Sequence, residues 1–220
     1  MKKLLLAISI TVLLAGCQAN HQPAEERLRA FSDHLNMENA TTFTGEWVFI
    51  GPEIMSGRIS DIDVPKGSTD IIYAAAATGG VWKSSDAGAT WFPVLEKEAS
   101  ASVGDIAVAP SDPDIIFAGL GEANAYRSGM SGTGIYRSED AGTTWHYTGL
   151  AETGTVGRIV IHPGNPDIIF VGASGRTWKN SPDRGVYKST DGGNSWTKVF
   201  YLNDGAGCID LVMDPSNPTS

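Results

Sequence analysis

Cysteine is scarce in this chain of 220 residues, which contains only Cys17 and Cys208. Because Cys17 ends an N-terminal apolar segment, the chain beyond it holds one thiol, and no intramolecular disulfide is expected there. Cys208 lies in an apolar pattern and is predicted to be a small core residue. The histidines are His21, His34, His146 and His162. They share no metal-ligand spacing with one another or with a cysteine, so no metal and no other cofactor is expected.

Positive charge is also in short supply, with 16 lysines and arginines against 25 aspartates and glutamates. Without Lys2 and Lys3, which precede the apolar segment, the net charge changes from −9 to −11. Such an acidic protein has little electrostatic attraction to nucleic acid or to an anionic bilayer surface. Nucleic acid is therefore not expected as a partner.

Long hydrophobic runs are absent apart from residues 4–14, which are too few for the roughly 20 residues of a membrane-spanning helix. The run follows two lysines and ends in Leu14-Ala15-Gly16-Cys17. This pattern resembles a bacterial lipoprotein signal peptide with its lipobox, covering residues 1–17. An ordinary secretory signal with a chance cysteine is the alternative.

The lipoprotein resemblance implies cleavage before Cys17, acylation of that cysteine and export to the cell envelope. Gln18 stands at the next position instead of aspartate, which by the rule of that class implies the outer membrane. Residues 18–43 are predicted to form a polar tether. A short helix is expected over residues 23–37, with Leu28, Phe31 and Leu35 on one face. We interpret it as a spacer that leans on the following domain; a partner-binding helix is the alternative.

The chain repeats one eight-residue segment three times, at 84–91, 138–145 and 189–196. Each copy reads Ser-x-Asp-x-Gly-x-x-Trp, and the copies start 54 and 51 residues apart. The fixed residues are Ser84, Asp86, Gly88 and Trp91, then Ser138, Asp140, Gly142 and Trp145, then Ser189, Asp191, Gly193 and Trp196. A period of this length predicts radially repeated β-structure or a solenoid.

The chemistry of these segments predicts a turn between two strands. Serine and aspartate side chains bond nearby backbone N–H groups, and the glycine supplies a positive φ. The tryptophan then covers the turn with apolar area. We interpret the aspartates as structural, since three equivalent acids repeated by a fold cannot all form one active site.

These segments resemble the Asp-box, or bacterial neuraminidase repeat, and we call them boxes from here on. The motif occurs in sialidases, sortilin-type receptors and xyloglucanase-type glycoside hydrolases, which are all β-propellers. In those families the box joins the third and fourth strands of a blade, away from the ligand face. The resemblance therefore implies a fold and says little about function.

Laying the repeats over one another gives the rest of the blade. Trp47 matches the box tryptophans, which begin fourth strands, and residues 47–50 are predicted to be such a strand. First strands are expected from Arg58, Val103, Val156 and Cys208, and second strands over 71–76, 115–120 and 168–173. Each unit then contains four short antiparallel strands, as a propeller blade does. We predict an all-β propeller over residues 44–220, with three full blades and two partial ones in an incomplete ring. We hypothesise that it is the N-terminal fragment of a longer propeller, whose remaining blades are partners of this part.

The connections between second and third strands vary most, and variable loops on a repeated scaffold carry function most often. Two of these loops, 121–133 and 174–184, are long and dissimilar. The predicted ligand-binding residues are Arg58, Glu122, Asn124, Tyr126, Arg127, Arg176, Trp178 and Lys179. Loops that are merely solvated, or that pack on further blades, are the alternative.

Catalysis by a glycosidase usually needs two carboxylates across a cleft. Glu122 is the one candidate for a catalytic carboxylate on these loops. Resemblance to xyloglucanase-type enzymes places a catalytic aspartate where this chain has Ala77, and resemblance to sialidases expects a proline where it has Ser60.

Over residues 44–220 the chain is most similar to large bacterial proteins with sortilin-like propeller repeats. We predict a lipid-anchored module that binds a polypeptide or a glycan at the cell envelope, without a complete catalytic site in this chain. The alternatives are a glycoside hydrolase whose carboxylates lie partly in further blades, and a purely structural spacer.

Overall fold

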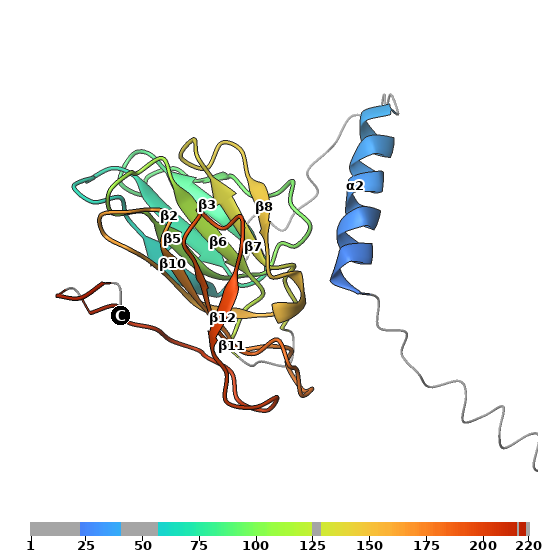
Figure 1. Cartoon of the computed structure of the whole chain (residues 1–220). Coiled ribbons are helices and arrows are strands. Elements are labelled where there is room, and N and C mark those ends of the chain that lie inside the picture. The colour runs from blue at the N-terminus through green and yellow to red at the C-terminus, as the bar shows by residue number, and fades with distance from the viewer. Residues whose placement is uncertain (1–22, 41–56, 125–128, 215, 219–220) are drawn as a thin grey trace, which may run out of the picture.

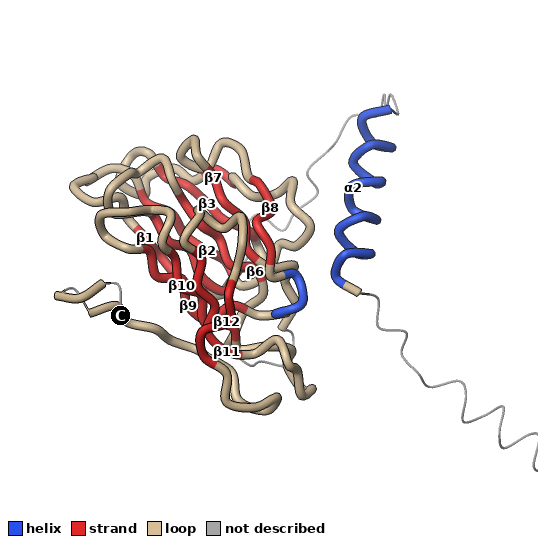
Figure 2. The backbone as a smooth tube through the Cα atoms, in the orientation of Figure 1, coloured by secondary structure: helices blue, strands red, loops and turns tan. Residues whose placement is uncertain are grey.

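The computed structural model describes residues 23–40, 57–124, 129–214 and 216–218 of the chain. These residues form one helix, one 3-10 turn and three four-stranded antiparallel sheets (Figures 1 and 2). Blade 1 contains β1 (Ile59–Asp63), β2 (Ile72–Ala76), β3 (Gly80–Ser84) and β4 (Phe92–Pro93). Blade 2 contains β5 (Val103–Val108), β6 (Ile116–Leu120), β7 (Ile135–Ser138) and β8 (His146–Gly149). Blade 3 contains β9 (Val156–Ile161), β10 (Ile169–Ala173), β11 (Gly185–Ser189) and β12 (Thr197–Phe200).

The strand order within each sheet follows the chain, so every blade is a simple meander. The predicted all-β propeller with four-stranded blades is confirmed, and the second strands begin one residue later than predicted. Residues 47–50, the predicted fourth strand of a preceding blade, lie outside the described residues. So do the domain boundaries at residues 17 and 43, which stay predictions.

The hydrophobic core lies between blades. One cluster joins residues of blades 1 and 2, including Tyr73, Val81 and Ile106, and a second joins blades 2 and 3. The alternation of strand residues decides which neighbour each side chain meets. Ile106 and its equivalent Ile159 are buried against the preceding blade, whereas Ile62, their equivalent in blade 1, is 58% exposed.

The box tryptophans follow the same rule. Trp145 Nε1 donates to the carbonyl oxygen of Val94 in the preceding blade at 2.7 Å, and Trp196 Nε1 donates to that of Thr148 at 2.9 Å. Trp91, in blade 1, donates instead to Gly88 within its own box at 3.0 Å. The box tryptophans of blades 2 and 3 therefore bond a backbone carbonyl of the preceding blade. Trp91 has no preceding blade among the described residues.

The predicted first strand from Cys208 does not form, and the prediction of a core cysteine is wrong. Residues 201–214 contain no strand, and Cys208 is half-buried. The segment still lies against blade 3, since Cys208 N–H donates to Ala173 O at 3.0 Å. The bond of the equivalent Val156 N–H, to Gly121 O at 2.9 Å, reaches one residue further, just past the end of the second strand of its neighbouring blade. The first strands β1, β5 and β9 each pair with the second strand of their own blade. No such second strand follows Cys208 among the described residues.

The helix α2 (Ala24–Ala40) extends beyond the predicted 23–37. Its first turn lies beside the 3-10 turn η2 (Ala151–Thr153), which connects blades 2 and 3 (Figure 1). Within the described ranges, no helix combines the length and apolar character needed to cross a membrane.

Candidate functional site

The three boxes hold their turns with the same hydrogen bonds. In the first, Ser84 Oγ donates to Asp86 Oδ1 at 2.8 Å and accepts from Gly88 N–H at 2.8 Å. Thr90 donates its N–H to Asp86 Oδ1 at 2.8 Å and its hydroxyl to Oδ2 at 2.6 Å. The second and third boxes repeat these contacts. Gly88 has a φ of +90°, which favours glycine.

Hydrogen bonds to the ionised carboxylate favour its charged form. The hydroxyl and N–H of Thr90 accordingly lower the pKa of Asp86 to about 2, and Asp140 and Asp191 are lowered to about 2 by the equivalent Thr144 and Ser195. These carboxylates serve the turns, on the side of the blades opposite the loops that join second and third strands.

On the loop side, the predicted residues Arg58 and Glu122 are brought together. Arg58 Nε donates to Glu122 Oε1 at 2.5 Å, and its Nη2 forms an ion pair with Oε2. The Glu122 side chain is only 1% exposed, and its N–H donates to Ser102 Oγ at 3.2 Å. The bidentate pair joins the start of blade 1 to the loop of blade 2, with the carboxylate turned away from solvent.

A second ion pair involves the predicted Arg176, whose Nη2 contacts Glu152 Oε2. Glu152 lies in η2, and its Oε1 also accepts the N–H of Ala24, the first residue of α2, at 2.6 Å. Sequence reasoning missed Glu152, because nothing in its local pattern indicates contacts 24 and 128 residues away. Asn124 is exposed. Tyr126, Arg127 and Cys17 lie outside the described residues.

A pocket of about 310 Å³ opens beside the loop 174–184. Its walls come from Ala123, Ser174, Gly175, Arg176, Thr177, Trp178, Arg184, Gly205, Gly207 and Ile209. Trp178 is 82% exposed, with a φ of +65°, and the adjacent Lys179 is also exposed. Two of the predicted ligand-binding residues, Arg176 and Trp178, thus line one pocket, and a third, Lys179, follows directly in the sequence.

Besides Arg176, which is paired with Glu152, the pocket contains a second cation, Arg184, which sequence reasoning did not include. Its guanidinium bonds three backbone carbonyls, those of Ser174, Arg176 at 2.9 Å and Lys179 at 3.0 Å. These bonds fix the loop but leave the positive charge without a carboxylate partner from the described residues. A pocket that combines an exposed aromatic side chain with a fixed cation suits a polar ligand that carries hydroxyl or carboxylate groups.

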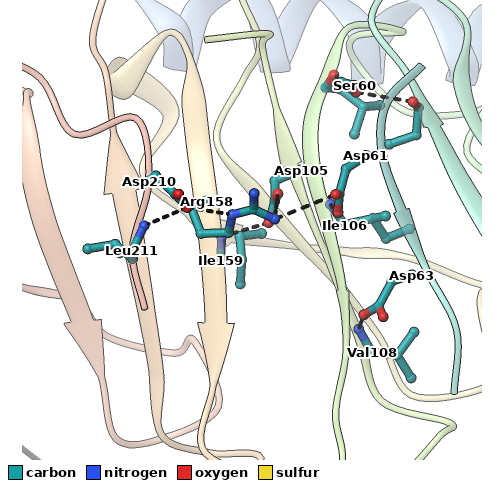
Figure 3. Close-up of polar contacts among 12 residues, drawn as sticks. Ser60, Asp61, Asp63, Asp105, Ile106, Val108, Arg158, Ile159, Asp210 and Leu211 are labelled. Atoms are coloured by element: carbon teal, nitrogen blue, oxygen red, sulfur yellow. Dashed lines mark hydrogen bonds and ion pairs between the residues drawn. The ribbon is translucent and has the colours of Figure 1, made fainter. Parts of the chain in front are cut away.

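A second cluster that the sequence analysis did not identify lies between the first strands (Figure 3). Its members Asp61, Asp105, Arg158 and Asp210 occupy one register position in successive repeats, each directly before an isoleucine or leucine. Arg158 Nη1 lies 3.1 Å from Asp105 Oδ1 and 3.5 Å from Asp61 Oδ1, and its Nε donates to Asp210 Oδ1 at 3.0 Å. One arginine thus links carboxylates from three other repeats.

Asp105 of this cluster, and Asp63, which lies two residues after Asp61, also bond the next blade. Asp105 Oδ2 accepts the N–H of Ile159 at 2.7 Å, and Asp63 Oδ2 accepts that of Val108 at 2.7 Å (Figure 3). Burial raises the pKa of Asp105 to about 7, and the charge of Asp61 adds to the shift, while Ile159 N–H and Arg158 oppose it. Burial also raises the pKa of Asp63. The cluster couples blades, and its carboxylates are occupied by backbone and arginine donors.

Two expectations about catalytic groups can be compared with the described residues. At the position where the xyloglucanase-type resemblance expects an acid, Ala77 is buried and its N–H donates to Arg58 O at 2.9 Å. Among the described residues no group of histidine, cysteine, aspartate and glutamate is arranged to hold a metal ion.

Comparison with known proteins agrees with this fold. The family model described as Sortilin, neurotensin receptor 3, matches residues 79–209, which is more than half of the chain. The chain belongs to the Sortilin-Vps10 family of propellers. A model of the prokaryotic membrane lipoprotein lipid attachment site matches residues 1–18, which supports an exported protein anchored by lipid.

Similar curated proteins are enzymes. A xyloglucanase from Paenibacillus sp is 27% identical over 98% of this chain and 20% of its own length. Xyloglucanase Xgh74A from Acetivibrio thermocellus is 28% identical over 86% of this chain and 25% of its own length. The crystal structure of an ancestral GH74 enzyme superposes with a TM-score of 0.56 at 22% identity, over 74% of this chain and 21% of that one.

The chain thus spans about a fifth to a quarter of the curated relatives it matches. It is a propeller related to glycoside hydrolases, and the structural likeness shows the fold alone.

Proposed function

We propose that this protein is a lipid-anchored propeller at the outer membrane that binds a polypeptide or a glycan through the loop side of its blades. The observation that carries the proposal is the pocket beside the loop 174–184, whose walls include both the exposed Trp178 and Arg184. Aromatic faces stack on sugar rings and on apolar peptide side chains, and arginine donors orient the polar groups beside them.

The state of the carboxylates on this side favours binding over hydrolysis. A glycosidase needs one carboxyl group as acid and a second as base or nucleophile, both facing the substrate. Glu122 is buried against Arg58, and Glu152 is shared between Arg176 and Ala24. Both carboxylates are therefore engaged in holding the loops.

The test is titration of the detergent-solubilised full chain with xyloglucan oligosaccharides and with an array of peptides and envelope glycans. Replacing Trp178 with alanine is expected to weaken the tightest interaction about 10- to 100-fold, because a central aromatic anchor contributes a large share of binding energy. Phe92→Ala is a matched control, since Phe92 is an exposed aromatic of blade 1 outside the pocket. Unchanged affinity in Trp178→Ala, or binding of none of the probes, contradicts the proposal.

The alternative is a glycoside hydrolase, and the observation that favours it is the similarity to xyloglucanases at 27–28% identity. It is tested by xyloglucan hydrolysis with the longest native product of the gene. If Glu122 acts in catalysis, Glu122→Gln lowers kcat by at least about 100-fold, as loss of an acid–base group does.

The control for that measurement is Arg58→Gln, which breaks the same ion pair and keeps the carboxylate. A catalytic Glu122 predicts a far larger loss in Glu122→Gln than in Arg58→Gln. Equal losses in the two variants assign the pair to holding blade 1 against blade 2.

A further inference from the structure

We propose that the anchored protein turns its loop side, around Glu152, Arg176 and Trp178, toward the bilayer that holds its lipid, and that the contact between Ala24 and Glu152 fixes this orientation. The inference rests on acylation of Cys17, which belongs to the proposed function. It adds which face of the propeller meets the membrane.

The first argument is the length of chain between the anchor and the propeller. Ala24 follows Cys17 by seven positions in the sequence. An extended chain advances at most about 3.6 Å per residue, so Ala24 lies within about 25 Å of the acylated residue whatever path the segment takes. The point where α2 meets the propeller is therefore close to the bilayer surface.

The second argument is the contact at that point. The Ala24 side chain is buried, and the backbone N–H of Ala24 donates to Glu152 Oε1 at 2.6 Å. A carboxylate at the first turn of a helix is stabilised by the free N–H groups and by the helix dipole. Because Glu152 Oε2 is paired with Arg176, the start of the helix is tied through one side chain to the loop that carries Trp178.

The third argument is the chemistry of the surface that this arrangement brings to the membrane. The loop 174–184 exposes Trp178 and Lys179 side by side. Tryptophan and lysine are the residues that settle at the level of lipid headgroups, with the ring among the carbonyls and the ammonium near phosphate. The partner of this face is thus the headgroup region of the bilayer, and a ligand of the pocket is one displayed close to that surface.

The boxes lie at the other ends of the same strands. Strands β9 and β11 have 6 and 5 residues, and a rise of about 3.3 Å per residue places the third box roughly 16–20 Å further along the blade than the loop side. This difference is large enough to measure by energy transfer.

The experiment uses the acylated full chain in liposomes of phosphatidylethanolamine and phosphatidylglycerol that contain a headgroup-labelled acceptor. Cys208 is replaced by serine, and a donor dye is attached at Asn180→Cys in the loop or at Asn194→Cys in the third box. Both positions are exposed. Energy transfer at position 180 is expected to exceed that at position 194 by about two-fold, given a separation of this size.

The role of the contact between Ala24 and Glu152 is tested with Glu152→Ala. This variant is expected to remove the difference in energy transfer between the two label positions. Glu139→Ala is the matched control, since Glu139 is a carboxylate of the second box paired with Arg137 at 3.1 Å, and it is expected to keep the difference. Equal transfer at the two labels, stronger transfer at position 194, or a difference that Glu152→Ala leaves intact overturns the proposal. Mass spectrometry verifies the acyl chains, and probe binding in detergent tests the proposed function separately.

Discussion

Replacing Gly104 with alanine is expected to destabilise the protein by about 3–5 kcal/mol or to prevent its folding, because the added methyl group meets backbone. A Cβ at this position would lie 2.0 Å from Val156 O and 2.5 Å from Gly121 O. Backbone carbonyls cannot rotate away as a flexible side chain can. The β5 and β9 strands would have to separate, which opens the core between blades 2 and 3.

The same position in the other repeats supports this reading. Gly157 is its equivalent in blade 3, and a Cβ there would lie 2.4 Å from Ile209 O. In blade 1 the equivalent is Ser60, whose Oγ donates to Val103 O at 2.7 Å. A small residue is therefore needed wherever the first strand of one blade approaches that of the next.

Chemical denaturation of purified wild type and Gly104→Ala measures the effect. Gly57→Ala is the control, because a Cβ at Gly57 meets nothing within 4 Å, and its free energy of unfolding is expected to stay within about 0.5 kcal/mol of wild type. A Gly104→Ala protein as stable as the control would show that the blades are not packed this closely.

The second large effect is a loss of unfolding free energy as the pH rises, caused by Asp105. Its pKa is raised from 3.8 to about 7 in the fold, so the folded state holds its proton more tightly than the unfolded state does. The stabilising contribution of this protonation is complete below about pH 4 and is lost as the pH rises through 7. Between pH 5 and pH 8 the shift corresponds to a loss of about 2–3 kcal/mol of unfolding free energy.

Asp105→Asn is expected to remove most of that loss, because the amide has no ionised form and its oxygen still accepts the N–H of Ile159. Urea denaturation at several pH values between 5 and 8 gives the slopes of the two proteins. Asp114→Asn, a change at an exposed aspartate, is expected to keep the wild-type slope. The box aspartates, with a pKa of about 2, lose their contribution only as the pH falls through that value, outside this window. Parallel slopes for Asp105→Asn and wild type would contradict the prediction.

The sequence by itself determined the blades. Ser84, Asp86 and Gly88 form their turn through contacts that span at most four residues, and a contact so local repeats whenever the residues repeat. The alternation of apolar residues then set the strands and their register. The loops 121–133 and 174–184 were recognisable as variable, although their contacts were not.

Only the tertiary structure decided which side chains meet. Asp105 and Arg158 are 53 residues apart in sequence, and Glu152 is bound by Arg176 and Ala24 from two different elements. Cys208 fits a strand pattern, yet it is half-buried and outside any strand because no described second strand pairs with it. A periodic pattern encodes which face of a strand is apolar, whereas the partner of a charged or unpaired side chain depends on how neighbouring blades are placed in space.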